Sequence, residues 1–363
     1  MNNSNKTSFL GYLHNFRSFA IINIVAVHSI GLALYFVSNN SDDAKNPYHI
    51  LNQLLFHNST IYFAIISGLL FSVVSKSNGY KHFYISKFKN VLLPYLFLTV
   101  LFSLFNPSPK DFFALHTNFM LYLKDALRNF IYGKAQFTYW YIPVLLFLYL
   151  VTPLLEYIMN IRRWGTILMI LILSLPLAIS RVELLLNADS DVSLHLSTMI
   201  YFMGAYAAGM YFGTNPEERF IWVKKNMLLF IVITILSSAA LIYFEIKNIN
   251  MFGAWSLRGT LFYIQKICLS AIFIILFKNR SEQQHYWLGQ IANYSFTIYF
   301  LHAFFLLILY GLIMPFTTLN IIPPLQLLIV SLIFLTMSIT LSMLTGWIFK
   351  KLFGKYSRML VGS

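Results

Sequence analysis

The chain consists mainly of long apolar runs, which are separated by short polar segments that carry most of the charge. Ten runs approach the roughly 20 residues that an α-helix needs to cross the hydrocarbon core of a bilayer. A transmembrane β-barrel is excluded, because its strands alternate polar and apolar residues. The pattern predicts an all-α, polytopic membrane protein with about ten spans, near residues 15–37, 53–75, 90–106, 138–159, 164–180, 196–213, 226–244, 258–278, 291–314 and 325–349.

The ten runs use most of the chain, so we expect one transmembrane domain over residues 1–363 and no separate soluble domain. The first run is expected to persist as a helix, because it is too long for a cleaved signal peptide and no small-residue cleavage site follows it. The longest connection, about 107–137, is expected to hold an interfacial helix. It carries Pro107, Pro109, Lys110, Asp111, Lys124, Asp125 and Arg128.

Composition supports the membrane assignment. Hydrophobic residues make up 58% of the chain and charged residues 10%, whereas soluble domains carry about 25% charged residues. This excludes a water-soluble enzyme and a disordered protein. The single cysteine, Cys268, excludes an intrachain disulfide.

The formal net charge of +14 is explained mainly by topology. If the N-terminus is cytoplasmic, 17 of the 26 lysines and arginines fall in cytoplasmic segments. Cytoplasmic loops of membrane proteins are enriched in these residues. We therefore predict that both termini are cytoplasmic. No nucleic-acid partner is expected, because no basic soluble domain is present to bind one.

The first span carries two ionisable residues, Arg17 and His28, which lie eleven residues apart. This spacing is close to three helical turns, so both side chains share one face and lie about 16 Å apart. Ionisable groups inside a membrane are costly and usually functional. We expect Arg17 at the cytoplasmic boundary and His28 near the middle of the bilayer. The alternatives are a snorkelling arginine and a histidine that only packs.

The ninth span carries Ser295, Tyr299 and His302 at helical spacing, so they share one face. His302 is expected at a depth similar to that of His28. The two histidines predict a shared polar cavity, although unrelated packing roles would also place them so. No metal site is expected, because the chain lacks an HExxH motif and a cysteine pair.

Several further residues have both a structural and a functional interpretation. Ser67 and Gly68 permit close helix packing. Three lysines before the third span either anchor it in the cytoplasm or bind phosphate groups; they are Lys81, Lys87 and Lys89. Trp140 is typical of an interfacial aromatic belt. Lys266 is expected to be partly buried in the eighth span and to snorkel outward.

Taken in their order along the chain, these motifs resemble those of the membrane acyltransferase 3 family, the ten-span O-acyltransferases of bacterial surface polysaccharides. The most specific match is a basic residue, ten residues and a histidine, which Arg17 and His28 provide. The resemblance extends over about residues 9–350. Its other matching positions are Tyr62, Phe63, Ser67 and Gly68, then Lys87, Lys89 and Pro94, then Trp140, Tyr149, Thr152 and Pro153, the segment YFMGAYAAGMYFG, and Ser295, Tyr299 and His302.

The resemblance implies an enzyme of the bacterial inner membrane that transfers an acyl group, usually acetyl, from cytoplasmic acyl-CoA to a sugar hydroxyl. The acceptor is a cell-surface polysaccharide or its lipid-linked precursor, and no bound cofactor is implied. A hydroxyl that attacks a thioester needs a base with a pKa near 7, which imidazole provides. His28 is therefore expected to act as general base or as transient acyl carrier, with Arg17 as its catalytic partner.

The remaining candidate residues divide into two groups. Arg17, Lys81, Lys87 and Lys89 are expected to bind the phosphates of acyl-CoA. A second group is expected to orient the acceptor or to polarise the thioester carbonyl; it comprises Ser67, Trp140, Tyr299 and His302.

Two other classes of function fit the same sequence. A small-solute transporter or channel would use the intramembrane histidines as a proton relay. A non-catalytic membrane partner in polysaccharide assembly would need neither histidine for chemistry.

Overall fold

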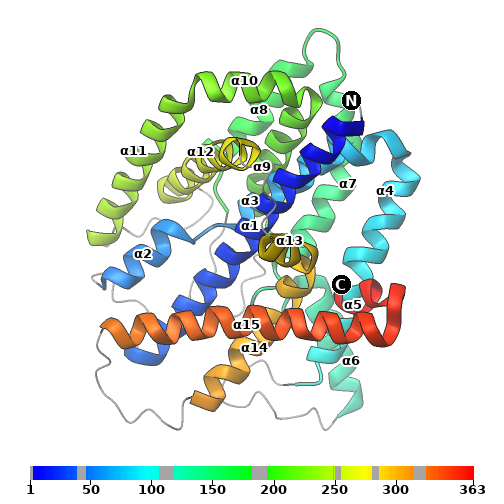
Figure 1. The fold of residues 1–363 in the computed structure, drawn as a ribbon, viewed down its shortest axis with the longest axis vertical. Coiled ribbons are helices and arrows are strands. Elements are labelled where there is room, and N and C mark those ends of the chain that lie inside the picture. The colour runs from blue at the N-terminus through cyan, green and yellow to red at the C-terminus, as the bar shows by residue number, and fades with distance from the viewer. Residues whose placement is uncertain are drawn as a thin grey trace. The chain divides into compact units, whose positions relative to one another are not determined.

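A computed structural model of the protein describes residues 3–38, 46–105, 118–181, 194–247, 249, 255–279, 286–313 and 324–363. Within these residues the chain forms helices joined by short connections and contains no β-strand (Figure 1). The predicted all-α class is confirmed. The backbone contacts divide the chain into two compact units, each made of three segments, and we describe each unit by itself.

The first unit contains Met1–Ala20, Asn58–Ile85 and Val144–Ala292. At its centre α9 (Leu196–Thr214) packs against α3 (Thr60–Leu70) and α8 (Gly165–Ala178), while α11 (Met227–Ile246) pairs with α12 (Leu257–Asn279). The unit also includes the first part of α1 (Asn3–Ser38), α4 (Gly79–Lys87), most of α7 (Tyr141–Met159), α10 (Pro216–Lys225) and α13 (Tyr286–Asn293).

Glycines bring α3 and α9 unusually close together. A Cβ atom on Gly68 would lie 2.1 Å from the carbonyl oxygen of Tyr206, and one on Gly209 would lie 2.0 Å from that of Ile65. Neither position therefore accepts a side chain without moving a helix backbone. Small residues allow such approaches between membrane helices, and the packing predicted for Gly68 is confirmed.

The second unit contains Ile21–His57, Ser86–Pro143 and Asn293–Ser363. Here α14 (Ser295–Ile313) packs against α15 (Pro324–Phe353), and α16 (Ser357–Val361) packs against α15 and α5 (Leu93–Phe102) (Figure 1). The second part of α1, α2 (Pro47–Leu55) and α6 (Phe119–Tyr132) complete the unit. Its buried apolar cluster joins α1, α14 and α15 through Ala33, Leu34, Leu306, Leu309, Leu327 and Phe334.

Eight helical stretches among the described residues are long and apolar enough to cross a membrane. They match eight of the ten predicted spans, and the polytopic membrane class is confirmed. The stretches are Gly11–Tyr35, Pro47–Ser75, Gly79–Phe102, Tyr141–Met159, Met227–Ile246, Leu257–Lys278, Ser295–Ile313 and Leu325–Val361.

The other two predicted spans differ from expectation for separate reasons. The 14 residues of α8 reach about 21 Å, which is shorter than a hydrocarbon core of about 30 Å. The 19-residue α9 is long enough, but its tyrosines and glycines lower its mean hydropathy. Because most of its residues are buried, α9 packs mainly against protein, and burial there does not require a purely apolar sequence.

Two predicted spans also contain breaks. The second is interrupted between α2 and α3, where Asn58 adopts a left-handed φ of 62°. The third begins earlier than predicted, at Gly79, and contains a π-helical turn over Phe88–Leu92 just before Pro94. Proline lacks an N–H group and crowds the preceding turn. π-Helical turns are rare and occur mostly as single-turn bulges inside α-helices.

The longest connection contains a helix, α6, as expected; its interfacial position stays a prediction. The side chain of Asn118 caps its start by accepting hydrogen bonds from the backbone N–H groups of Met120 and Leu121, and Gly133 ends it at a left-handed φ of 66°. Lys124, Asp125 and Arg128 lie on this helix. The predicted loop residues Pro107, Pro109, Lys110 and Asp111 lie outside the described residues.

Replacing Gly68 with alanine is expected to destabilise the protein, because the new Cβ would meet a backbone oxygen of α9. Overpacking of this kind typically costs about 1–3 kcal/mol. The matched control is Gly311→Ala, since a Cβ at Gly311 meets no atom within 4 Å and alanine suits a helix better than glycine. Thermal melting of the purified protein in detergent measures both effects. Equal melting temperatures for the two variants would contradict this account of α3 and α9.

Candidate functional site

Two histidines meet inside the second unit. His28 comes from α1 and His302 from α14, and their ring centroids lie 5.6 Å apart with 32° between the ring planes. His302 is fully buried, whereas His28 is half-buried. The structure therefore brings together the two histidines that were predicted to share a cavity.

The hydrogen bonds of His302 identify its tautomer. Its Nδ1 atom lies 2.9 Å from the carbonyl oxygens of both Ile298 and Tyr299. A carbonyl oxygen only accepts hydrogen bonds, so Nδ1 carries a proton and donates it. In a neutral imidazole the other nitrogen then holds a lone pair. This Nε2 atom is buried and has no hydrogen-bond partner among the described residues.

His28 has a different environment. The ring of Phe137 stands edge-on to it, with centroids 5.1 Å apart and 75° between the planes. One residue earlier, the carbonyl oxygen of Val27 accepts a hydrogen bond of 3.2 Å from the side-chain amide of Asn52 on α2. That bond attaches α2 to α1 beside the histidine. Within the described part of the chain, no hydrogen bond engages the His28 ring, so its nitrogens remain available for a substrate.

Two tyrosines join the segment before α7 to α14. The Tyr139 hydroxyl donates a hydrogen bond of 2.9 Å to the Phe300 carbonyl oxygen, and the Tyr299 hydroxyl donates one to the Thr138 carbonyl oxygen. The Tyr299 ring also lies 6.1 Å from the His302 ring. Because the Tyr299 proton is engaged by Thr138, this tyrosine holds α14 and its histidine in place.

Trp140, another candidate residue, lies in the same segment. Its side chain is half-buried, and its ring meets that of Tyr141 edge-on with centroids 5.9 Å apart. The indole is therefore next to the paired tyrosines in sequence and is partly accessible, as a residue that contacts a substrate needs to be.

Arg17 and Ser67 belong to the first unit, where both approach Tyr149 of α7. The Ser67 hydroxyl is within hydrogen-bond reach of the Tyr149 hydroxyl, and the Arg17 guanidinium is close enough to act on it electrostatically. Nearby on α7, Thr152 donates to the Leu148 carbonyl oxygen at 2.8 Å. The Thr152 oxygen therefore accepts the hydrogen bond from Tyr206, also at 2.8 Å.

A single helix carries both Arg17 and His28, because α1 runs without a break from Asn3 to Ser38. Eleven residues of α-helix correspond to about 16 Å along the axis. The prediction that Arg17 and His28 lie on one continuous helix is confirmed.

The three candidate lysines lie around the start of the third membrane-spanning stretch. Lys81 is exposed on α4, Lys87 is half-buried at the end of α4, and Lys89 is exposed in the π-helical turn. Lys81 belongs to the first unit and the other two to the second. Binding of acyl-CoA by these residues stays a prediction.

Lys266 is more buried than predicted: partial burial with outward snorkelling was expected. Its side chain is fully buried on α12, with Nζ 5.8 Å from the centre of the Tyr62 ring. Sequence alone could not reveal this, because which face of α12 meets α3 is decided by packing. The aromatic ring offers its negative face to the amine.

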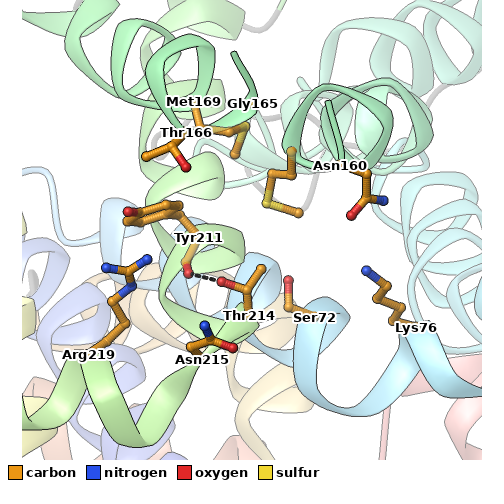
Figure 2. Close-up of a pocket in the computed structure, with 11 residues that line it drawn as sticks. Ser72, Lys76, Asn160, Gly165, Thr166, Met169, Tyr211, Thr214, Asn215 and Arg219 are labelled. Carbon is orange, nitrogen blue, oxygen red and sulfur yellow. Dashed lines mark hydrogen bonds between the residues drawn. The ribbon is translucent and has the colours of Figure 1, made fainter. Parts of the chain in front are cut away.

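Sequence analysis did not identify a polar pocket of about 470 Å³ in the first unit (Figure 2). Its lining includes Ser72, Lys76, Asn160, Thr166, Tyr211 and Arg219. The lining residues come from three separate stretches of the chain, 72–76, 159–169 and 211–219, and the two cations had been attributed to topology alone. No group of three or more potential metal-ligating side chains occurs in the described ranges.

Comparison with known proteins identifies the family. The family model for an acyltransferase domain matches residues 10–347. The chain belongs to this acyltransferase family. Searches of curated proteins and of solved structures found no match. The family match confirms the resemblance seen in the sequence, and it includes Arg17, His28, Tyr299 and His302 of this membrane acyltransferase.

Tyr139→Phe is expected to destabilise the acyltransferase, because it removes a buried hydrogen bond to α14. A typical intramolecular hydrogen bond contributes about 1 kcal/mol. Tyr35→Phe is the matched control, since the side chain of Tyr35 is 45% exposed. Thermal melting in detergent compares the two variants. If Tyr139→Phe melts no earlier than Tyr35→Phe, the link between this segment and α14 does not stabilise the fold.

Proposed function

We propose that the protein is an inner-membrane O-acyltransferase that moves an acetyl or other short acyl group from cytoplasmic acyl-CoA. The acceptor is a hydroxyl of a cell-surface polysaccharide or of its lipid-linked precursor. The observation that carries this proposal is the pairing of His28 with His302 in a chain of the acyltransferase family.

The reaction requires a proton acceptor at the site. As the sugar hydroxyl attacks the thioester carbonyl, a carbon–oxygen bond forms and the carbon–sulfur bond breaks. The hydroxyl proton passes to an imidazole and then to the departing thiolate. General-base assistance of this kind typically contributes 10²–10⁴-fold to a rate. His28 is the better candidate base, because it is more accessible than His302 and its ring makes no hydrogen bond to a described residue.

His302 would support His28 in this scheme. Its Nδ1–H is held by two carbonyl oxygens of α14, which fixes the ring and leaves Nε2 as an acceptor. The centroids are 5.6 Å apart, so a ring rotation or one water molecule would let His28 donate to Nε2. The opposite nitrogen of His28 would then be unprotonated and able to take the hydroxyl proton. Transient acylation of that same nitrogen is the alternative route.

The helical distance between Arg17 and His28 fits the donor. About 16 Å of helix is comparable to the length of the pantetheine arm of CoA. With Arg17, Lys81, Lys87 and Lys89 contacting the phosphates, the thioester would reach toward His28. Ser67 and Trp140 would contact the substrates, and Tyr299 would act by holding α14 through Thr138.

His28→Ala is expected to lower the rate of acyl transfer by at least about 100-fold, as loss of a general base does. His302→Ala is expected to cause a smaller loss of about 10-fold or more, because it removes orientation rather than the base. His82→Ala on the exposed surface of α4 is the matched control. Transfer of label from radiolabelled acetyl-CoA to a glycan acceptor, with purified protein in nanodiscs, measures all three rates.

Wild-type transfer by His28→Ala would exclude its proposed role. Mass spectrometry of quenched protein separates the two routes, since an acyl-histidine adds one acyl group to the chain and direct attack adds none. Solute flux into liposomes that proceeds without CoA would instead support the transporter alternative.

A further inference from the structure

The pocket shown in Figure 2 lies among the ends of several helices of the first unit. Ser72 and Lys76 follow α3, Asn160 follows α7, Thr166 begins α8, and Arg219 belongs to α10. The volume of about 470 Å³ falls in the range of small-molecule sites, which is about 300–1,000 Å³. The positive-inside topology predicts that these connections face the cytoplasm.

The pocket lining is positively charged. It contains Lys76 and Arg219 and no carboxylate. Two carboxylates contact lining residues from outside the pocket: Glu156 pairs with Lys76 at 3.1 Å, and Glu218 accepts a hydrogen bond from Asn215. Lys76 is thus partly neutralised, while Arg219 makes no ion pair with any described residue.

Arg219 is held in place with its donors unused. The guanidinium carbon lies 4.1 Å from the centre of the Tyr211 ring, and Figure 2 shows the side chain against that ring. Its buried Nε atom has no hydrogen-bond partner in the described part of the chain. Stacking fixes the plane of a guanidinium and leaves its fork of N–H groups free for two-point binding of phosphate or carboxylate.

The start of α8 adds neutral donors to this cation. Gly165 and Thr166 line the pocket at the first residues of a 14-residue helix. The Gly165 N–H already donates to the Ile161 carbonyl oxygen at 2.8 Å, so this helix start contributes the N–H of Thr166 and the helix dipole, which favours an anion there. The side chains of Thr166 and Asn160 make no hydrogen bond to described residues, and both reach the same pocket.

We propose that this pocket binds a phosphate group, held by the Arg219 fork, Lys76 and the N-terminus of α8. The shared ligand chemistry is a phosphomonoester or diphosphate. It has two sources at a cytoplasmic membrane face: the phosphorylated end of a soluble nucleotide, or the headgroup of an anionic phospholipid. The proposal rests on the pocket alone and does not depend on either histidine.

The test uses the full chain in phosphatidylcholine nanodiscs. In the first arm, calorimetry measures binding of adenosine 3′,5′-bisphosphate and of inorganic pyrophosphate. In the second arm, native mass spectrometry measures retention of phosphatidylglycerol added to the detergent-purified protein. Arg219→Gln is expected to weaken binding at least about tenfold in the arm that detects a ligand, consistent with loss of a charge-assisted bidentate pair.

Three further variants keep the test decisive. Thr166→Phe should fill the pocket and weaken binding without changing charge, so that agreement with Arg219→Gln assigns the loss to the pocket rather than to net charge. Lys225→Gln makes the same charge change on the exposed surface of α10 and should bind as the wild type does. His28→Ala should also bind normally, which separates this site from the acyl-transfer chemistry. The proposal is overturned if the wild type binds no probe in either arm, or if both pocket variants retain wild-type binding.

Discussion

A polar side chain inside a membrane helix must find its hydrogen-bond partner within the protein, because lipid offers none. This constraint explains the placement of the buried tyrosines. Tyr139 donates to Phe300, Tyr299 to Thr138, and Tyr206 to Thr152. Each bond joins segments that are far apart in the sequence and belong to one unit. The polar groups that raise the cost of insertion therefore also determine how the helices pack.

Two buried nitrogen atoms without a hydrogen-bond partner among the described residues, His302 Nε2 and Arg219 Nε, are informative because of their chemistry. Several buried oxygens and the Nδ1 atom of His14 also lack partners among the described residues, but His302 Nε2 lies beside a second imidazole, and Arg219 Nε belongs to a cation at a pocket. A buried group left unpaired costs about 1–3 kcal/mol. Such a cost is offset when a substrate or ligand supplies the missing partner, which is why the two sites fit binding and catalysis better than packing.

The local sequence pattern was sufficient to predict which residues lie together when both residues belong to one helix. Arg17 and His28 share a face of α1, and Tyr299 and His302 share a turn of α14, because helical periodicity fixes both pairs. The meeting of His28 and His302 required only the additional inference that both lie at the same depth. By contrast, the pocket around Arg219 draws residues from three separate stretches of the chain, and no periodicity connects them. Lys266 was misjudged for a similar reason, since the choice of a buried or lipid-facing side depends on the neighbouring helix.

The burial of polar groups inside the protein also explains why α9 is less apolar than a lipid-facing span. Tyr201 and Tyr206 make α9 less apolar than a lipid-facing span, yet both are fully buried inside the first unit. The close contact at Gly68 and Gly209 makes this possible, because it brings the backbone of α9 against α3 and excludes lipid from between them. Tyr206 can then reach Thr152 on α7, while Ser67, next to Gly68, reaches Tyr149 on the same helix. The small residues and the tyrosines are thus two parts of one arrangement: the glycines remove the space that lipid would fill, and the hydroxyl groups hold α7 beside α3 and α9, where Arg17 acts on Tyr149.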